Sequence, residues 1–166
     1  MQNIYLVGFM GTGKTAVGRE LAKTLRVQLL DIDDLIVQRE KRSINDIFTL
    51  NGEPYFRKIE RDTLVEVSRK TNHVVSCGGG IMINPDNIAT MKQTGKLIAL
   101  SATPEVIFER TKKHAHRPLL NVSDPKAKIG ELLNARKPFY EKSDFIIDTS
   151  ESTVNEVAQK VLGLIR

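Results

Sequence analysis

The feature that most constrains the fold is a short apolar run that ends in a glycine-rich loop near the start of the chain. Ile4 to Val7 read IYLV, and Gly8 to Thr15 read GFMGTGKT. The octet fits the pattern G-x-x-x-x-G-K-[ST], in which glycines let the backbone turn around phosphate oxygens and aim several N–H groups inward. An apolar run before the loop and a helical pattern after it complete the context in which this pattern binds phosphate. The sequence therefore predicts a strand, a phosphate-binding loop and a helix, in that order.

Two side chains of this loop have the chemistry to bind a magnesium nucleotide. We expect the Lys14 amine to reach the β- and γ-phosphates of ATP and the Thr15 hydroxyl to bind Mg²⁺. The loop does not identify the phosphate acceptor, because GTPases, motor ATPases and small-molecule kinases all use it. No guanine-reading N-K-x-D sequence is present. The other nucleotide contacts predicted in this stretch are Gly11, Thr12, Gly13 and Ala16.

Short apolar runs alternate with helical patterns along the chain. Such runs, rich in Val, Ile and Leu, are typical of parallel strands that are buried on both faces. Their alternation with helices predicts an α/β fold with a doubly wound parallel sheet. The expected strands are Asn3 to Val7, Gln28 to Asp31, His73 to Cys77, Lys96 to Leu100 and Asp144 to Ile147. The expected helices are Lys14 to Arg26, Ser43 to Leu50, Pro54 to Lys70 and Thr153 to Ile165, with three more that begin at Pro85, Pro104 and Pro125.

Length and composition fit one domain over residues 1–166. No apolar run approaches the ~20 residues that a membrane span needs. The net charge of +5 comes from scattered basic residues without interleaved aromatics, so we expect no nucleic-acid partner. A single cysteine, Cys77, fits a reducing compartment. We expect a monomeric cytoplasmic protein with no signal peptide and no membrane partner.

One stretch has neither a clear strand nor a clear helix. Thr111 to Asp124 read TKKHAHRPLLNVSD, which is polar and basic. A loop of this length in a compact domain is usually functional. We interpret it as a lid that carries Arg117.

Carboxylates follow the second strand, at the position where open α/β sheets bind ligands. Leu29 to Asp34 read LLDIDD, which places Asp31 and Asp33 two residues apart. In one interpretation, one carboxylate faces Mg²⁺ and the other faces a hydroxyl of the phosphate acceptor. In the other, Asp33 or Asp34 simply caps a helix from Leu35 to Glu40. The residues alone leave both interpretations open.

Several arginines indicate that the phosphate acceptor is acidic. The segment GEPYFRKIE places Arg57 and Glu60 one helical turn apart. They form either a plain ion pair or an anion-binding arginine that a carboxylate holds in place. With Lys14, Arg117 and Arg136, the chain has more cations than a magnesium triphosphate requires, and arginine binds carboxylates well.

Six stretches together make the chain resemble the shikimate kinase family over nearly its whole length. They are GFMGTGKT, LLDIDD, SINDIFTLNGEPYFRKIE, CGGG, RPLL and NARKPFY. The resemblance implies the nucleoside-monophosphate-kinase-like P-loop fold, a three-layer α/β/α arrangement with five parallel strands in the order 2-3-1-4-5. It implies the reaction of ATP and shikimate to give ADP and shikimate 3-phosphate, with Mg²⁺, in aromatic amino-acid biosynthesis. The acceptor-binding subregion then covers about residues 32–61, and the lid covers about residues 111–124.

On the acceptor side, the resemblance implies a role for each matching position. Asp33 matches the aspartate that contacts the shikimate hydroxyls and is the proposed base. Arg57 and Arg136 match the pair that holds the shikimate carboxylate. The run Gly78-Gly79-Gly80 matches the backbone that approaches the ring. Two aromatic residues match packing around the acceptor, Phe48 and Phe56.

On the nucleotide side, Asp31 matches an acidic residue that acts near Mg²⁺ through water, and Arg117 matches the lid arginine that reaches the ATP phosphates. Arg110 matches a residue that flanks the adenine. Two places depart from the family pattern. Cys77 stands where members often carry threonine before the three glycines, and the segment after Ser150 matches weakly.

Three other functions remain open from the residues. A related small-molecule kinase, such as a gluconate kinase, would keep the loop and the lid but would not need two arginines for a ring carboxylate. A nucleotide-binding switch or assembly ATPase would turn over nucleotide without a small acceptor. An ATPase associated with nucleic acid is indicated by the net charge alone. The three glycines, with Arg57 and Arg136, favour the acceptor kinase.

Overall fold

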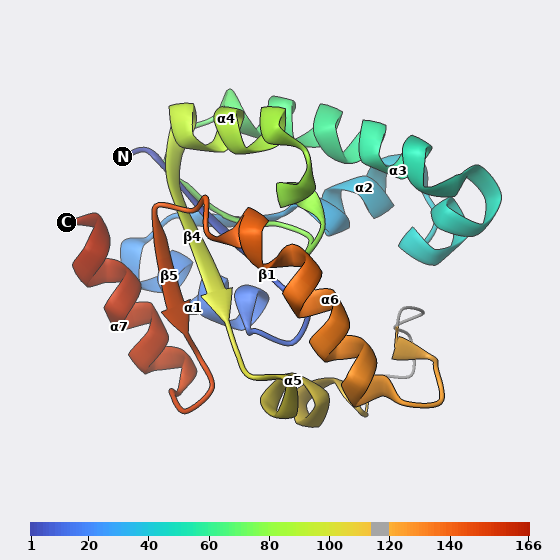
Figure 1. Cartoon of the computed structure of the whole chain (residues 1–166). Coiled ribbons are helices and arrows are strands. Elements are labelled where there is room, and N and C mark those ends of the chain that lie inside the picture. The colour runs from blue at the N-terminus through green and yellow to red at the C-terminus, as the bar shows by residue number, and fades with distance from the viewer. Residues whose placement is uncertain (114–119) are drawn as a thin grey trace.

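The computed structural model describes residues 1–113 and 120–166. It shows a parallel sheet between helices, with both termini on one side of the molecule (Figure 1). In these ranges, no helix is both long enough and apolar enough to cross a bilayer. The strands are β1 (Asn3–Gly8), β2 (Gln28–Asp31), β3 (His73–Ser76), β4 (Gly95–Ser101) and β5 (Phe145–Asp148). The helices are α1 (Lys14–Leu25), α2 (Ile32–Glu40), α3 (Ile44–Ser68), the 3₁₀ turn η1 (Ile81–Ile83), α4 (Pro85–Thr94), α5 (Pro104–Thr111), α6 (Pro125–Tyr140) and α7 (Val154–Ile165).

The strand order is β2-β3-β1-β4-β5 and every neighbouring pair is parallel, which confirms the predicted order. In the central strand β1, Leu6 is aligned with Ser76 of β3 on one side and with Ile98 of β4 on the other. Because all strands run in the same direction, the segments that follow them gather at one edge of the sheet. That edge holds the glycine-rich loop after β1, the aspartates after β2 and the three glycines after β3.

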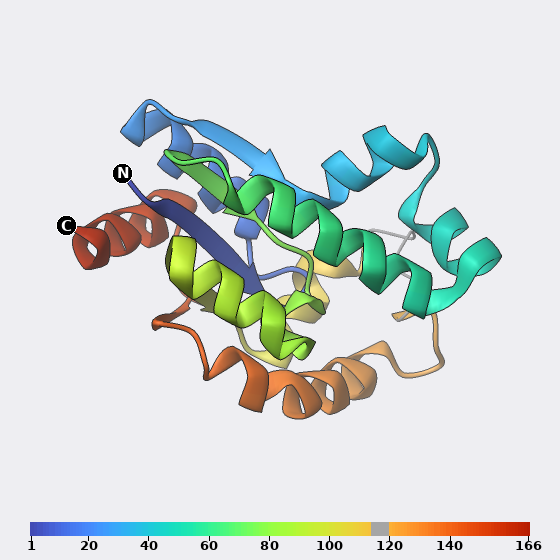
Figure 2. The same ribbon diagram turned by 90° about the horizontal axis from the view of Figure 1, so that it is seen from above.

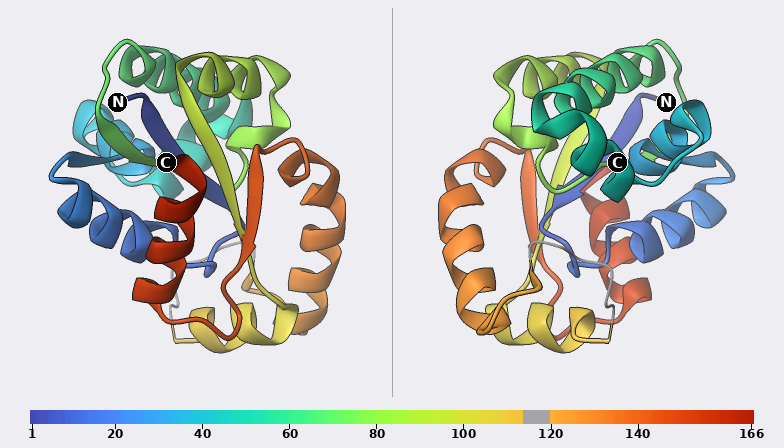
Figure 3. Two further views of the ribbon diagram at one scale, coloured as in Figure 1. Left: turned by 90° about the vertical axis from the view of Figure 1, so that its left-hand side faces the viewer. Right: turned by 90° about the vertical axis from the view of Figure 1, so that its right-hand side faces the viewer.

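Helices cover both faces of the sheet, and each face has its own core (Figure 2). Tyr5 and Val7 of β1 pack with residues of α3 and α4, whereas Ile4 and Leu6 pack with residues of α1 and α7. All four side chains are at most 1% exposed. Burial on both faces explains why the strand reads as a continuous apolar run. Figure 3 shows the twisted strands between the helical layers.

A smaller cluster anchors the glycine-rich loop to the helices before and after the predicted lid. Phe9 of the loop is fully buried against Ile107 of α5 and Ile129 of α6. The loop is therefore held by the packing of Phe9 against α5 and α6, in addition to its connections to β1 and α1.

Helix α3 contains a break at the place that the sequence predicts. The sequence predicts separate helices from Ser43 to Leu50 and from Pro54 to Lys70, and α3 spans both segments under one label. Gly52 lies between them with φ 81° and ψ 169°, a conformation that glycine adopts readily, and it kinks the helix. The predicted separation into two helices is confirmed, because the backbone at Gly52 is not helical and divides α3 into two arms.

The other element boundaries shift by a residue or two. β3 ends at Ser76, one residue earlier than predicted, and β5 begins at Phe145, one residue later. Asp144 is used differently, since its carboxylate accepts a hydrogen bond from the Leu97 N–H at 2.8 Å. Three predicted helix starts are confirmed, each preceded by a capping side chain: Pro85, Pro104 and Pro125.

Candidate active site

The glycine-rich loop has the geometry of an anion cradle. Gly8, Gly11 and Gly13 all have positive φ. Gly13 is the N-cap of α1, and no described side chain caps that end, so the N–H groups of the first turn are available to an anion. The Lys14 amine lies across the loop, where it donates to the Gly8 carbonyl at 2.8 Å and to the Phe9 carbonyl at 3.0 Å.

Asp31 ends β2 and caps the next helix. Its Oδ1 accepts hydrogen bonds from the N–H groups of Asp33 at 3.0 Å and Asp34 at 3.2 Å, so Asp31 is the N-cap of α2. The interpretation in which Asp33 or Asp34 caps a helix from Leu35 is therefore wrong. The second oxygen of Asp31, Oδ2, lies 3.5 Å from Oγ1 of Thr15. These two oxygens form a donor pair of the kind that Mg²⁺ prefers.

The Asp33 side chain, in the first turn of α2, does not cap the helix. Its Oδ1 is buried and has no hydrogen-bond partner among the described residues. Burial, with the negative charge of Asp31 in support, raises the pKa of Asp33 from 3.8 to about 6, although Lys14 lowers it. A methyl group on Gly78 would lie 3.2 Å from this Oδ1, so glycine keeps the space beside the carboxyl group open.

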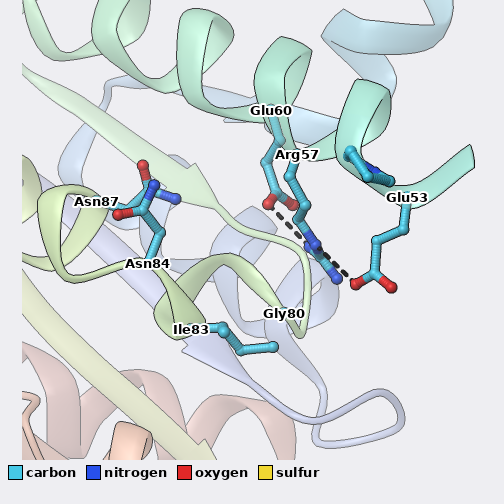
Figure 4. A pocket seen from close by; sticks show the side chains of 8 residues that line it. Glu53, Arg57, Glu60, Gly80, Ile83, Asn84 and Asn87 are labelled. Atoms are coloured by element: carbon cyan, nitrogen blue, oxygen red, sulfur yellow. Dashed lines mark hydrogen bonds and ion pairs between the residues drawn. The ribbon is translucent and has the colours of Figure 1, made fainter.

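Arg57 and Glu60 form the ion pair that their spacing predicts. Nη1 of Arg57 donates to Oε1 of Glu60 at 2.9 Å, and Nε donates to Oε1 of Glu53 at 3.3 Å (Figure 4). The Glu60 side chain is 1% exposed. Burial raises the pKa of Glu60 to about 7, even though Arg57 lowers it. A methyl group on Gly80 would overlap the guanidinium group of Arg57, so this close approach requires glycine.

A hollow of about 290 Å³ opens beside Arg57 (Figure 4). Helix α3 forms one wall, and η1 with the start of α4 forms the other. An arginine and two glutamates give the hollow a polar wall on the acceptor side of the molecule. Its lining residues are Glu53, Pro54, Arg57, Glu60, Gly80, Ile83, Asn84 and Asn87.

Arg136 reaches the same glycines from α6. Its guanidinium carbon lies 5.4 Å from the ring centroid of Phe9, and a methyl group on Gly79 would lie 3.1 Å from its Nη1. Tyr140, one turn further along α6, donates its hydroxyl to the Gly79 carbonyl at 2.7 Å. Burial raises the pKa of Tyr140, so the hydroxyl stays a donor. The sequence analysis missed Tyr140, although its spacing of four residues from Arg136 was a usable signal.

The two phenylalanines of α3 have different surroundings. Phe56 is 4% exposed, whereas Phe48 is 36% exposed, and their ring centroids lie 4.7 Å apart. The Arg57 guanidinium carbon lies 5.3 Å from the centroid of Phe56. Phe56 therefore belongs to the core and also packs against the arginine.

The structure brings the predicted acceptor residues into one electrostatic environment. The charges of Lys14 and Arg57 both lower the pKa of Asp33. The pKa of Glu60 responds to the charges of Arg57, Asp33 and Arg136. The three glycines after β3 lie between these groups, as the contacts above show.

The predicted nucleotide-binding residues outside the glycine-rich loop have different surroundings. Arg110 donates to the Gly11 carbonyl at 3.1 Å and to Oγ1 and the carbonyl of Thr149 at 3.0 and 2.7 Å, so it contacts the backbone of the loop. Ala16 is exposed in the first turn of α1. Arg117 lies outside the described residues.

Comparison with known proteins gives one consistent family. The family model for shikimate kinase matches residues 10–166. A shikimate kinase of Caldanaerobacter subterraneus subsp. tengcongensis is 46% identical over 162 residues, which cover 98% of this chain and 95% of that protein. A shikimate kinase of Thermodesulfovibrio yellowstonii is 43% identical, with 98% and 94% covered.

Solved structures agree with the sequence comparisons. A shikimate kinase from Acinetobacter baumannii, solved in complex with shikimate, has a TM-score of 0.94 and 38% identity, with 99% of this chain and 93% of that chain covered. The shikimate kinase from Aquifex aeolicus has a TM-score of 0.82 and 35% identity, with 98% and 94% covered. The similarity therefore extends over the loop, the acceptor side and the whole sheet.

Proposed function

The chain belongs to the shikimate kinase family and is an ATP-dependent phosphotransferase that acts on an alcohol group of shikimate, and we propose that it phosphorylates the 3-hydroxyl through the residues described above. Because the chain belongs to this family, we set aside the three alternative functions that the sequence left open. The proposal assigns a role to each group of the site, from the acceptor hydroxyl to the nucleotide.

The observation that carries the proposal is the buried Oδ1 of Asp33, which has no hydrogen-bond partner in the part of the chain that the structure describes. An ionised carboxylate only accepts hydrogen bonds, so a hydroxyl is the natural partner for this oxygen. With a pKa of about 6, Asp33 is mostly ionised at pH 7. The same pKa lies close enough to pH 7 for the carboxylate to accept a proton. We infer that Asp33 orients the acceptor hydroxyl and takes its proton during transfer.

Arg57 and Arg136 are the proposed partners of the shikimate carboxylate. They approach the glycines of residues 78–80 from α3 and α6, so an acidic acceptor above these glycines meets a guanidinium group on each side. Glu60 supports this arrangement, because its 2.9 Å hydrogen bond fixes Arg57. Close packing against the two guanidinium groups explains the glycines at 79 and 80, and packing against the carboxyl groups of Asp33 and Glu60 explains Gly78.

The nucleotide side uses the loop and the first turn of α1. Lys14, close to the loop carbonyls, is placed to neutralise phosphate charge during transfer. The oxygens of Thr15 and Asp31 fit Mg²⁺. Among the described residues there is no group of three or more His, Cys, Asp or Glu that could hold a metal, so we assign the remaining ligands to phosphates and water. When bound, the ion neutralises phosphate charge and orients the phosphates.

Further roles in the proposal come from the sequence resemblance. Arg110 and Arg117 are assigned to ATP, with Arg117 carried by the lid of about residues 111–124. The proposal takes residues 1–166 as a single domain. A monomer is sufficient, because one chain supplies every residue of the proposed site. We also propose a cytoplasmic location, which the buried free thiol of Cys77 supports.

A coupled assay of ADP release from Mg·ATP, with and without shikimate, tests the function. We expect strong turnover that depends on shikimate. Hydrolysis that ignores shikimate would contradict the proposal. Asp33→Asn should lower kcat by at least about 100-fold with unchanged ADP affinity, as expected for a lost proton acceptor. Arg57→Ala should raise the KM for shikimate about 10- to 100-fold, because it removes a charged hydrogen bond.

A further inference from the structure

A buried hydroxyl outside the acceptor site connects the glycine-rich loop to the opposite half of the sheet. Thr149 follows β5 and is 3% exposed. Its Oγ1 lies 2.9 Å from the Thr12 carbonyl and 3.1 Å from the Ser101 carbonyl, so its proton serves these two acceptors. The same oxygen accepts a hydrogen bond from Nη1 of Arg110 at 3.0 Å. One hydroxyl thus joins the loop, the end of β4 and α5.

Arg110 strengthens this connection. Its Nη1 also donates to the Gly11 carbonyl at 3.1 Å, while Nη2 donates to the Thr149 carbonyl at 2.7 Å. A methyl group on Gly11 would lie 2.8 Å from Cγ2 of Thr111, so the last turn of α5 packs directly on the loop. Two successive loop carbonyls, those of Gly11 and Thr12, are therefore held from outside the loop.

Fixed carbonyls determine where the loop N–H groups point. In a planar trans peptide, the C=O and the following N–H point in opposite directions. When Thr149 holds the Thr12 carbonyl, the N–H of Gly13 is turned to the opposite side of the backbone, away from Thr149. Gly11 and Gly13 have φ values of 78° and 96°, and no side chain of their own restrains them. The loop also has internal hydrogen bonds, from the Thr12 N–H and hydroxyl to the Phe9 carbonyl, and the bonds from Thr149 and Arg110 add external restraints at the next two carbonyls.

We propose that Thr149 is a positioning residue for the nucleotide: its hydroxyl holds the Thr12 carbonyl and thereby preorganises the Gly13 N–H that receives an ATP phosphate, while Arg110 fixes the neighbouring Gly11 carbonyl. The proposal rests on the proposed function, because it assumes that a nucleotide occupies the loop. It gives Arg110 a contact with the protein in addition to the adenine-flanking role that the resemblance implies. It also assigns a role to Thr149, for which the sequence alone predicted none.

Thr149→Val tests the proposal, because it removes the hydroxyl and keeps the shape of the side chain. We expect the KM for ATP to rise about tenfold and the affinity for Mg·ADP, measured by calorimetry, to fall by the same factor. The KM for shikimate should not change. Thr149→Ser retains the hydroxyl and should restore the ATP KM to within about twofold of wild type.

The matched control is Thr63→Val. Thr63 is 2% exposed, and its hydroxyl donates to the Ile59 carbonyl at 2.7 Å within α3, so the same change is made away from the loop. This control should keep the wild-type ATP KM, even where its melting temperature falls. If Thr149→Val does not fold, Thr149→Ala removes the same hydroxyl and is measured in the same way.

Two results would overturn the proposal. One is a wild-type ATP KM and ADP affinity in Thr149→Val with only a lower melting temperature, since Thr149 would then be merely structural. The other is a parallel rise of the KM values for ATP and shikimate, since the effect would not be confined to the nucleotide. Failure of the proposed function is distinguishable, because wild-type ADP release would then not depend on shikimate, while calorimetry with Mg·ADP still tests Thr149.

Discussion

Replacing Asp33 with asparagine is expected to stabilise the ligand-free enzyme at neutral pH while it removes activity. The Oδ1 of Asp33 is buried and has no partner among the described residues, and the pKa of Asp33 is raised from 3.8 to about 6. At about 1.4 kcal/mol per pH unit, this difference corresponds to about 3 kcal/mol. Because the folded-state pKa lies above the unfolded value, the stability due to protonated Asp33 is complete below about pH 4. It is lost as the pH rises through about 6.

Urea unfolding between about pH 4 and pH 8, without nucleotide or shikimate, measures this effect. Asparagine carries no charge to desolvate, so Asp33→Asn should match wild type at about pH 4 and gain about 3 kcal/mol in unfolding free energy at about pH 8. Asp34→Asn is the matched control, since Asp34 lies in the same first turn of α2 and is exposed. Both changes remove a negative charge near the helix N-terminus.

The control separates desolvation from the loss of helix-end charge. Burial also raises the pKa of Asp34, but this exposed carboxylate keeps most of its water, so its substitution should give a much smaller dependence on pH. A gain for Asp33→Asn that is constant over the pH range would refute the reasoning, because it would not follow ionisation. So would the absence of any gain at about pH 8.

Three further changes test the acceptor side. Gly80→Ala should displace the Arg57 guanidinium and raise the shikimate KM about 10- to 100-fold, with ADP affinity by calorimetry unchanged. Tyr140→Phe removes the hydrogen bond to Gly79, so kcat/KM for shikimate should fall about fivefold, and a wild-type value would contradict this role. In the wild type, protonation of Glu60 below about pH 7 weakens its hold on Arg57, so the shikimate KM should rise as pH falls. In Glu60→Gln the KM should be high and independent of pH between about 7 and 8, where Asp33 stays mostly ionised, which steady-state kinetics would show.

Local signals predicted most of the fold. The strands are buried on both faces, so each leaves a short apolar run in the sequence, and prolines mark the starts of three helices. The strand order, by contrast, came from the resemblance, because no local pattern says which strands are neighbours. The break at Gly52 was visible in the sequence. The non-helical backbone at Gly52 divides α3 into the two arms that the sequence predicts, but their relative orientation depends on packing, which spacing does not report.

The candidate site, like the fold, was predicted only where local patterns carry the information. Arg57 and Glu60 were predictable as a pair because they lie one helical turn apart. The roles of Asp31 and Asp33 were not separable, since either carboxylate has the chemistry to cap a helix and only the turn after β2 decides which one does so. Thr149 was missed because its hydrogen bond joins it to Thr12, 137 residues earlier in the chain. Contacts of this kind depend on the sheet topology.

The cost of an unpaired carboxylate explains why the acceptor side is built around Gly78. A methyl group there would lie 3.2 Å from Oδ1 of Asp33 and 3.3 Å from Oε2 of Glu60, two buried carboxylate oxygens that have no hydrogen-bond partner among the described residues. The ligand-free enzyme therefore holds two desolvated acceptors beside one open backbone position. A hydroxyl donated to Asp33 supplies the missing partner and removes part of this cost, so binding of shikimate should stabilise the wild type more than Asp33→Asn. The cost of these two desolvated oxygens in the ligand-free site thus favours binding of the acceptor. Gly78, which has no side chain, leaves the space beside these carboxylates that the acceptor needs.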